Sequence, residues 1–359
     1  MSNVQPETVT RRTWWRVLFW PTWVQRKKML RRETVVFLAV ASLLLVFSYL
    51  WPMNLATRST GFVLGAWLSF MVQALAFHLG LVLALITAVS ALTLQWRMLA
   101  VALPLTAITL GPECRAYWPA SPPALREPRY RVMSTNLLHL NDDKEPLWRE
   151  IHDFDPDILF LQEYTDGWHS YLEPRLLDRL PHHHWVCRED SFGQAIYSRY
   201  RFMEPVEANL PLGHAAEPQM RAVIDLAGRP LTAYNVHLLP PKNLEYFTEH
   251  RQQLADLCTL LYAETQPVIL AGDFNFTGRD PHAAAIAMTG LRDCYRQAGW
   301  GRCATWPVNS VFRFLPGLRL DHIYVGNGLG CALYRTGTGR GSDHRPVLVE
   351  IGFRHTPAF

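Results

Sequence analysis

The chain has 359 residues, of which 49% are hydrophobic and only 18% are charged. Soluble domains carry about 25% charged residues, so this chain is poor in charge. Six cysteines in this length exclude a small scaffold built on disulfides. A mean hydropathy of −0.02 excludes wholesale disorder, and the length indicates roughly two domains.

Charge is divided unevenly along the chain. Residues 1–120 hold 11 Lys+Arg against 3 Asp+Glu, a balance of +8, whereas residues 121–359 hold 24 against 28, a balance of −4. The acidic C-terminal part argues against a nucleic acid as its main partner, because polyanions select basic surfaces.

The N-terminal third is typical of a membrane segment. Charge-free apolar runs occupy residues 34–53 and 61–94, and a further apolar run extends from 98 to Glu113. About 20 apolar residues suffice to cross the hydrocarbon core. We therefore expect three spans within 34–117, at about 34–53, 62–94 and 98–116. The alternative is two spans, with 62–94 as one long helix and 98–112 at the interface.

The tail at residues 1–33 sets the orientation. Eight Arg and Lys residues precede the first span, and the two later breaks carry only Arg58 and Arg97. The positive-inside rule keeps this tail in the cytoplasm. Three spans then place the rest of the chain outside, and two place it inside. The tail's tryptophans suit an interfacial segment, and a floppy basic tail is the alternative. The late start of the apolar run is not typical of a cleaved signal peptide.

A Pro-rich linker at residues 118–128 leads into one domain at 129–355. At about 3.1 Å per residue, a stiff linker of this length holds the domain near the membrane. The stripe of apolar residues in 243–264 predicts a helix. Runs rich in Val, Ile, Leu, Tyr and Phe predict strands at 130–136, 157–163, 194–200, 222–226, 231–237, 267–273, 319–326 and 345–353. The expected fold is α/β, a mixed sheet system with helices outside.

Polar residues stand where many of these strands end. Asn136 closes RVMSTN, Glu163 closes DILFLQE, and Asn235 and His237 close YNVH. The remaining motifs are VILAGDFN with Asp273 and Asn275, RLDHIYV with Asp321, and SDH with Asp343 and His344. Ligands bind at strand ends in α/β folds, so these positions form the candidate site.

The series TN, LQE, NVH, GDFN, LDH and SDHRP resembles the endonuclease/exonuclease/phosphatase superfamily over about residues 129–353. The FGQAIYSRY run around Gly193–Tyr200, which begins at Phe192, also resembles the family's middle segment. The resemblance implies a four-layer sandwich of two packed sheets flanked by helices. It also implies a phosphoesterase that uses Mg²⁺, with Mn²⁺ as a substitute. The number of metal ions stays open.

The resemblance also distributes roles among the residues. The implied metal ligands are Asn136, Glu163 and Asp343. The implied catalytic residues are His237, Asp273, Asn275, Asp321 and His344. His344 acts as general base or phosphate contact and is oriented by Asp321, and His237 stabilises the phosphate or protonates the leaving group. The phosphate-binding candidates are Asn235 and Arg221, with a sheet-edge charge as the alternative for Arg221.

These patterns predict a multipass inner-membrane phosphoesterase with its catalytic domain outside the cytoplasm. The expected partners are the lipid bilayer and a phosphate ester, a lipid headgroup or a nucleic acid, with no obligate protein partner. A nuclease is the alternative, and a non-catalytic protein that binds a phosphorylated ligand is a third reading. The histidine at 237 matches the deoxyribonuclease, sphingomyelinase and phosphatase branches of the superfamily.

Three further features have an ordinary interpretation and a functional alternative. His182–His184 is expected to be a polar loop, with metal binding as the alternative. Trp306 and Phe312–Phe314 are expected in the core, with a substrate-facing wall or membrane contact as the alternative. Cys294 and Cys303 could form a disulfide if the domain lies outside.

Overall fold

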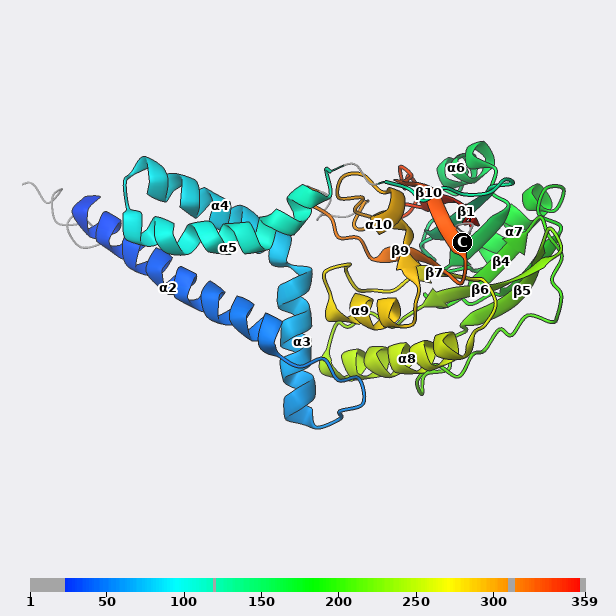
Figure 1. The fold of residues 1–359 in the computed structure, drawn as a ribbon, viewed down its shortest axis with the longest axis horizontal. Coiled ribbons are helices and arrows are strands. Elements are labelled where there is room, and N and C mark those ends of the chain that lie inside the picture. Colours follow the sequence, from blue (N-terminus) through cyan, green and yellow to red (C-terminus); the bar gives the residue numbers. More distant parts are fainter. Residues whose placement is uncertain (1–22, 119–120, 309–313, 356–359) are drawn as a thin grey trace, which may run out of the picture.

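The computed structural model describes residues 23–118, 121–308 and 314–355, and of residues 23–25 only the backbone. Most of the expected basic tail and Phe312 lie outside the described residues. The described chain consists of an arm of apolar helices and an α/β domain beside its base (Figure 1).

The α/β domain contains two sheets. The six-stranded sheet has the order β10-β11-β1-β2-β4-β3, and the five-stranded sheet has the order β5-β6-β7-β9-β8. The bounds of the first sheet's strands are β1 Tyr130–Asn136, β2 Ile158–Gln162, β3 His182–Val186, β4 Gln194–Ser198, β10 Leu329–Thr336 and β11 Val347–Phe353. Those of the second are β5 Met220–Leu226, β6 Arg229–His237, β7 Val268–Asp273, β8 Arg292–Asp293 and β9 Asp321–Gly326.

Side chains alternate between the two faces of each strand, and this alternation builds four layers. Val132 and Phe160 of one sheet meet Ala233 and Ile269 of the other in the central core. Helices cover the outer faces and complete the expected four-layer sandwich. They are α6 Glu145–Phe154 and α7 Asp166–Leu176 on the first sheet, and α8 Leu244–Ala263 and α9 Pro281–Met288 on the second. A short helix, α10 Cys294–Ala298, packs beside β10.

The sequence located most of these elements. Each of the eight expected runs holds a strand, although β5 and β6 begin two residues earlier than expected. Helix α8 lies within the expected helix, with Asn243 as its N-cap. Three strands were missed, namely β3, β8 and β10. The expected loop at His182–His184 is wrong: these residues form β3 and pair with β4, and the His183 ring stacks on Tyr197.

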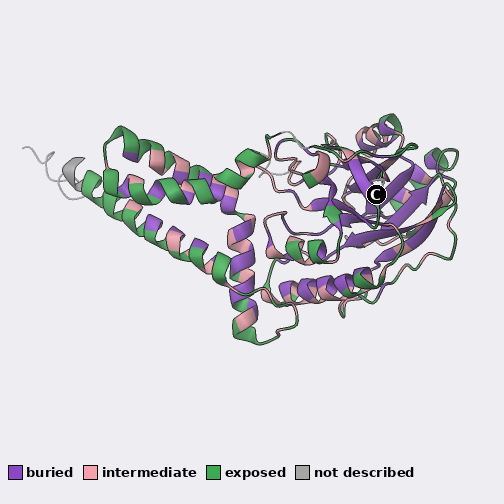
Figure 2. Cartoon of the chain, viewed as in Figure 1, coloured by how far each residue is buried: buried purple, intermediate pink, exposed green. Residues whose placement is uncertain are grey.

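The arm is made of three helices that pack against one another. They are α2 Trp23–Leu50, α4 Ala76–Leu92 and α5 Trp96–Arg115. Leu38 and Leu45 of α2, Leu83 of α4, and Met98 and Ala102 of α5 form their shared core. The outward faces carry apolar side chains and are mostly exposed (Figure 2).

Helix α3 Thr60–Ala74 crosses the base of the arm and packs against the α/β domain (Figure 1). Its Val63, Ala66 and Phe70 are buried together with α8 and α9. The Phe70 ring lies 5.3 Å from that of Phe247. The expected span at 62–94 is therefore two helices, α3 and α4, which meet at a bend of 59°.

Among the described residues, one helix, Arg26–Leu50, is long and apolar enough to cross a membrane. The pair α3 and α4 meets the same criterion only if it is taken as one bent span. Only 22% of the apolar window of the first helix is buried, which differs from the core helix of a soluble protein.

The linker contacts the first sheet, and the cysteines, all within the described residues, form no disulfide. Residues 121–128 lie along β10 and β11, where Leu125 is buried and pairs with Arg354. All six cysteines are free. The considered Cys294–Cys303 disulfide is not formed, because Cys294 is buried in the core and the Cys303 thiol donates to the Trp300 carbonyl.

Candidate active site

Strand register brings the predicted catalytic residues into one row. Parallel pairing of β6 with β7 sets His237 beside Asp273, and antiparallel pairing of β7 with β9 sets Asp273 beside Asp321. Gly272 has a φ of +144°, and a Cβ there would lie 1.8 Å from the Val236 carbonyl oxygen. The glycine of the GDFN motif is therefore required for the close approach of β6 and β7.

His344 and Asp321 form a buried ion pair. The Nδ1 atom of His344 lies 2.8 Å from Oδ2 of Asp321. Burial disfavours the charged ring, but the negative charges of Asp321 and Asp273 outweigh burial and raise the pKa of His344 to about 10. The imidazole is therefore a cation at neutral pH, able to donate a hydrogen bond from Nε2.

Asp273 lies between two histidines. Its Oδ2 atom is 3.6 Å from Nε2 of His237 and 3.7 Å from Nε2 of His344. Burial raises the pKa of Asp273 to about 6, although the two histidines act in the opposite direction. A carboxylate with a pKa near the working pH is suited to accept a proton.

Asn136 and Glu163 stand beside this row because β1 and β2 are parallel neighbours that end together. The Asn136 Nδ2 atom donates to Glu163 Oε1 at 2.9 Å and to Asp273 Oδ2 at 3.2 Å. Burial raises the pKa of Glu163. The proximity of His237 and the hydrogen bonds from His139 and Asn136 lower that pKa by a larger amount, so the net shift is downward. Glu163 is therefore an ionised oxygen donor.

His139 is a site residue that the sequence analysis missed. Its backbone N–H donates to Glu163 Oε2 at 2.9 Å, and its Nδ1 atom lies 2.6 Å from the same oxygen. His139 follows Asn136 by three residues in a loop, so no strand end marks it. Its closeness to Asn136 in sequence was the one available signal.

Several oxygens in the site suit a hard divalent cation. Carboxylate oxygens of Asp273 and Asp321 lie within 4.8 Å of each other, so negative charge is concentrated in this part of the site. The buried Oδ1 atoms of Asp343 and Asp321 have no hydrogen-bond partner. A buried carboxylate oxygen without a donor is costly, and a bound cation would satisfy it. The residues present therefore fit Mg²⁺.

Two aromatic side chains border this cluster. The Trp306 indole N–H donates to Asp343 Oδ2 at 3.1 Å, so Trp306 reaches the site. The Phe192 ring lies 5.4 Å from the His237 ring.

Asn275 lies close to the cluster, since its backbone N–H donates to Asp273 Oδ1. Its own amide donates to the Leu238 carbonyl, so the side chain is directed at the backbone.

Two predicted phosphate contacts lie elsewhere. The Asn235 amide is buried between the sheets, where it donates to the Leu161 and Ala195 carbonyls and accepts from Gln162. Both polar atoms of that amide have partners in the two sheets, so the side chain bridges the sheets and is not directed at the catalytic row.

Arg221 is on the outer face of the second sheet. Strand alternation directs it away from the inner face that holds Met220, and it binds Glu204, Glu207 and Glu264. Arg221 therefore matches the alternative interpretation, a charged residue at the edge of the sheet, since β5 is the edge strand of the five-stranded sheet.

Comparison with known proteins identifies the family. The Endonuclease/Exonuclease/phosphatase family matches residues 133–344, more than half of the chain. The chain therefore belongs to this family, whose members are enzymes that hydrolyse phosphoester bonds.

Among curated relatives, the UPF0294 protein VP2298 of Vibrio parahaemolyticus is 31% identical over 125 residues, which cover 34% of this chain and 41% of the relative. The protein YbhP of Escherichia coli is 30% identical over 175 residues, which cover 46% and 65%. The matched region thus spans less than half of the first relative's length.

Solved structures share the fold. Zebrafish (D. rerio) TDP2 complexed with a single-strand DNA product has a TM-score of 0.53 and 22% identity, covering 63% of this chain and all of that one. The 3′ phosphatase NExo from Neisseria, bound to a product DNA hairpin, has a TM-score of 0.51 and 20% identity, covering 62% and 100%. At such identities the likeness concerns the fold alone.

Proposed function

We propose that this chain is a membrane-anchored, Mg²⁺-dependent phosphoesterase that acts at the outer face of the membrane. The observation that carries the proposal is the convergence of Asn136 and Glu163 with the row of His237, Asp273 and Asp321. Phosphoester hydrolysis needs an activated water, stabilised phosphoryl oxygens and a leaving group that receives a proton, and this set of residues offers a group for each task.

Glu163, Asn136 and Asp343 would hold the Mg²⁺ ion, which when bound neutralises negative charge on the phosphoryl group. Asp273 acts as the general base and takes a proton from the attacking water. A P–O bond forms to that water oxygen, and the bond from phosphorus to the leaving oxygen breaks. The leaving oxygen takes a proton from His237, and Asp273, whose Oδ2 atom lies 3.6 Å from Nε2 of that ring, returns the proton of the attacking water to it.

The two histidines stabilise the phosphoryl group. His344, held as a cation by Asp321, donates from Nε2 to a phosphoryl oxygen. This role follows from its raised pKa, because a protonated imidazole cannot act as a base. His237 lies on the other side of Asp273 and is the second candidate donor. Of the two roles considered for His344, we therefore favour phosphate contact.

For the arm, we propose that α2, α4 and α5 cross the bilayer and that α3 lies at its outer surface. The helices have 28, 17 and 20 residues, or about 42, 26 and 30 Å at 1.5 Å per residue. Arg26, Lys27 and Lys28 at the start of α2, and Arg97 at the start of α5, mark the cytoplasmic end. The catalytic domain then lies outside the cytoplasm, at the inner membrane.

Exposed aromatic residues at the other end of the arm support this placement. Tyr117 and Trp118 follow α5 directly and are 52% and 78% exposed, and Trp300 of the catalytic domain is 65% exposed beside them. Aromatic residues of this kind collect at membrane–water interfaces. Two spans would instead place the domain in the cytoplasm. Reporter enzymes fused at the C-terminus, one active only in the periplasm and one only in the cytoplasm, distinguish these topologies.

The activity is tested on the full chain in detergent with bis-p-nitrophenyl phosphate, p-nitrophenyl phosphorylcholine and plasmid DNA, each with Mg²⁺ and with EDTA. We expect Mg²⁺-dependent hydrolysis that EDTA and Glu163→Ala both abolish. The matched control is His152→Ala, which removes an exposed imidazole outside the site. No hydrolysis of any compound by the folded, Mg²⁺-binding chain would contradict the proposal and favour the non-catalytic reading.

A nuclease is the second candidate function. The similar structures of zebrafish TDP2 and Neisseria NExo hold DNA products, which favours this candidate. The acidic balance of residues 121–359 opposes it. Faster cleavage of plasmid DNA than of the two small esters would support the nuclease.

A further inference from the structure

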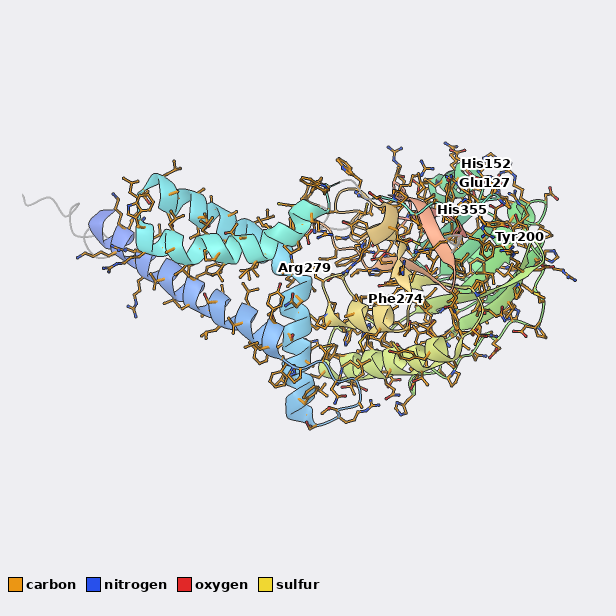
Figure 3. All side chains as sticks on the ribbon, viewed as in Figure 1. Glu127, His152, Tyr200, Phe274, Arg279 and His355 are labelled. Carbon is orange, nitrogen blue, oxygen red and sulfur yellow. The ribbon has the colours of Figure 1, made fainter. Side chains whose placement is uncertain are left out.

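A cavity of about 1150 Å³ lies between the helical arm and the catalytic domain. Its walls come from the end of α5, from the junction of α3 and α4, and from the loops at 277–279, 299–302 and 318–319. Arg279, labelled in Figure 3, marks the place where the catalytic domain meets the base of the arm. The cavity is distinct from the cluster of catalytic residues, none of which lines it.

The cavity is strongly basic. Five arginines line it, namely Arg115, Arg279, Arg296, Arg302 and Arg319, and Glu113 is the one carboxylate among its lining residues. Asp293, behind Arg319, adds a second negative charge. Five positive charges against two leave a net charge of +3 around the cavity, which borders a domain whose overall balance is acidic. Such a concentration of arginine selects an anion.

Three of the arginines are held in place by partners. Arg302 Nε donates to Glu113 Oε2 at 2.9 Å, and Arg279 lies 3.6 Å from the other oxygen of Glu113. Arg319 is buried against Asp293 at 2.7 Å. The two contacts with Glu113 join the cavity wall to α5, and together the three ion pairs fix three guanidinium groups before any ligand binds. Arginine sites with this pre-organisation lose little entropy on binding.

The other two arginines, Arg296 and Arg115, have guanidinium N–H groups that can donate to a ligand. Arg296 is exposed, and its Nη2 atom makes a long bond of 3.4 Å to the Gly278 carbonyl. Arg115 is exposed at the end of α5, and its guanidinium has no side-chain partner among the described residues. An anion in the cavity would pair with these two groups.

The cavity also has apolar lining residues, and this apolar surface continues onto the arm. Phe77, Trp118 and Leu318 line the cavity, and Phe77 packs under the Arg302 guanidinium at 3.6 Å. Exposed apolar side chains of α4 and α5 extend away from this end. A ligand that is anionic at one end and apolar at the other matches both parts of this surface.

We propose that this cavity binds the phosphate group of an anionic membrane lipid. The inference rests on the membrane placement proposed above, which puts the cavity at the outer headgroup level. Thr277–Arg279 begin two residues after Asn275, and Arg319 is two residues before Asp321. A bound headgroup would therefore contact the two loops that connect directly to the catalytic strands, and it would fix the catalytic domain against the bilayer.

The test uses the full chain in a non-ionic detergent with native mass spectrometry. Phosphatidylglycerol and phosphatidylcholine with identical acyl chains are compared, since only the first is anionic. We expect selective retention of phosphatidylglycerol, weakened about tenfold in the Arg115→Gln/Arg296→Gln variant, because each of these two exposed ion pairs contributes roughly a factor of three and the two factors multiply. Arg292→Gln, an exposed arginine outside the cavity, should retain the lipid like the unaltered chain.

Other outcomes overturn the inference. Equal retention of both lipids, or full retention by the double variant with an unchanged melting temperature, would exclude an anionic headgroup site. Displacement of the lipid by inorganic phosphate at equal concentration would show that the site takes the free anion. Glu163→Ala should abolish hydrolysis yet retain the lipid. Failure of catalysis and failure of this inference are therefore distinguishable.

Discussion

The imidazole of His344 and the carboxylate of Asp321 are joined by a contact of 2.8 Å between Nδ1 and Oδ2, and both side chains are buried. The backbone N–H of Asp321 is in turn 3.2 Å from the Thr305 hydroxyl oxygen. The pair therefore fixes both the orientation and the charge of the imidazole, with Nε2 left to face Asp273.

The first prediction concerns Asp321 as a positioning residue. Asp321→Asn removes a charge that raises the pKa of His344, so that pKa falls and the imidazolium is lost at lower pH. We expect kcat to fall by up to about 10²–10³-fold, the typical effect of losing one donor to a developing negative charge, and the alkaline limb of the pH–rate profile to move to lower pH. Asp225→Asn, which removes a carboxylate on β5 paired with Arg201, is the control. A lower rate with an unmoved alkaline limb would contradict the assigned role.

The second prediction concerns His139. Its N–H and its ring both contact Glu163 Oε2. Groups that orient a metal ligand typically contribute a factor of about 10–100 to metal affinity. His139→Ala should therefore raise the Mg²⁺ concentration needed for half-maximal rate by roughly that factor, whereas His152→Ala should not. An unchanged Mg²⁺ requirement would show that His139 only packs the loop.

The sequence located eight of the eleven described strands and most residues of the candidate site, because both leave local signals. Asn136, Glu163, Asp273 and Asp321 are polar residues at the ends of apolar runs, and such positions stand out without a structure. The register of the strands cannot be read from the sequence, because it depends on which strands pair. The row of His237, Asp273 and Asp321 therefore became visible only in the fold.

The errors have equally specific causes. Asn235 and Arg221 are on β6 and β5, where strand alternation and packing decide which face a side chain meets. Strand β3 was missed because three histidines lack the apolar pattern of a strand. The span at 62–94 was taken as one element because an apolar helix that packs on protein has the same composition as one that faces lipid.

The third prediction concerns stability against pH. Glu264 accepts hydrogen bonds from Arg221 Nε at 2.8 Å and from the Tyr234 hydroxyl at 2.7 Å. Burial raises the pKa of Glu264, but these bonds outweigh burial and lower it overall. A depressed pKa contributes stability above the unfolded-state pKa, and that stability is lost as pH falls through the folded-state pKa.

Glu264→Gln should therefore lower the free energy of unfolding by about 1–2 kcal/mol at neutral pH, and the difference should shrink in acid. Glu204→Gln is the matched control, because Glu204 pairs with the same arginine but its side chain is 49% exposed. It should cost less than about 0.5 kcal/mol. Thermal unfolding of the full chain across pH measures both. A loss of stability in Glu264→Gln that becomes larger as pH falls would contradict the lowered pKa of Glu264.

The last prediction concerns the docking of α3. Phe70 is 4% exposed and packs on Phe247, His250 and His282 of the α/β domain. Phe70→Ala leaves a cavity in this interface and should destabilise the full chain by about 3–5 kcal/mol. The control is Leu85→Ala on α4, since Leu85 is 66% exposed and touches no such core. Thermal unfolding in detergent should show a much lower midpoint for Phe70→Ala alone. Equal midpoints would mean that α3 does not stabilise the catalytic domain and that it is free to move with the bilayer.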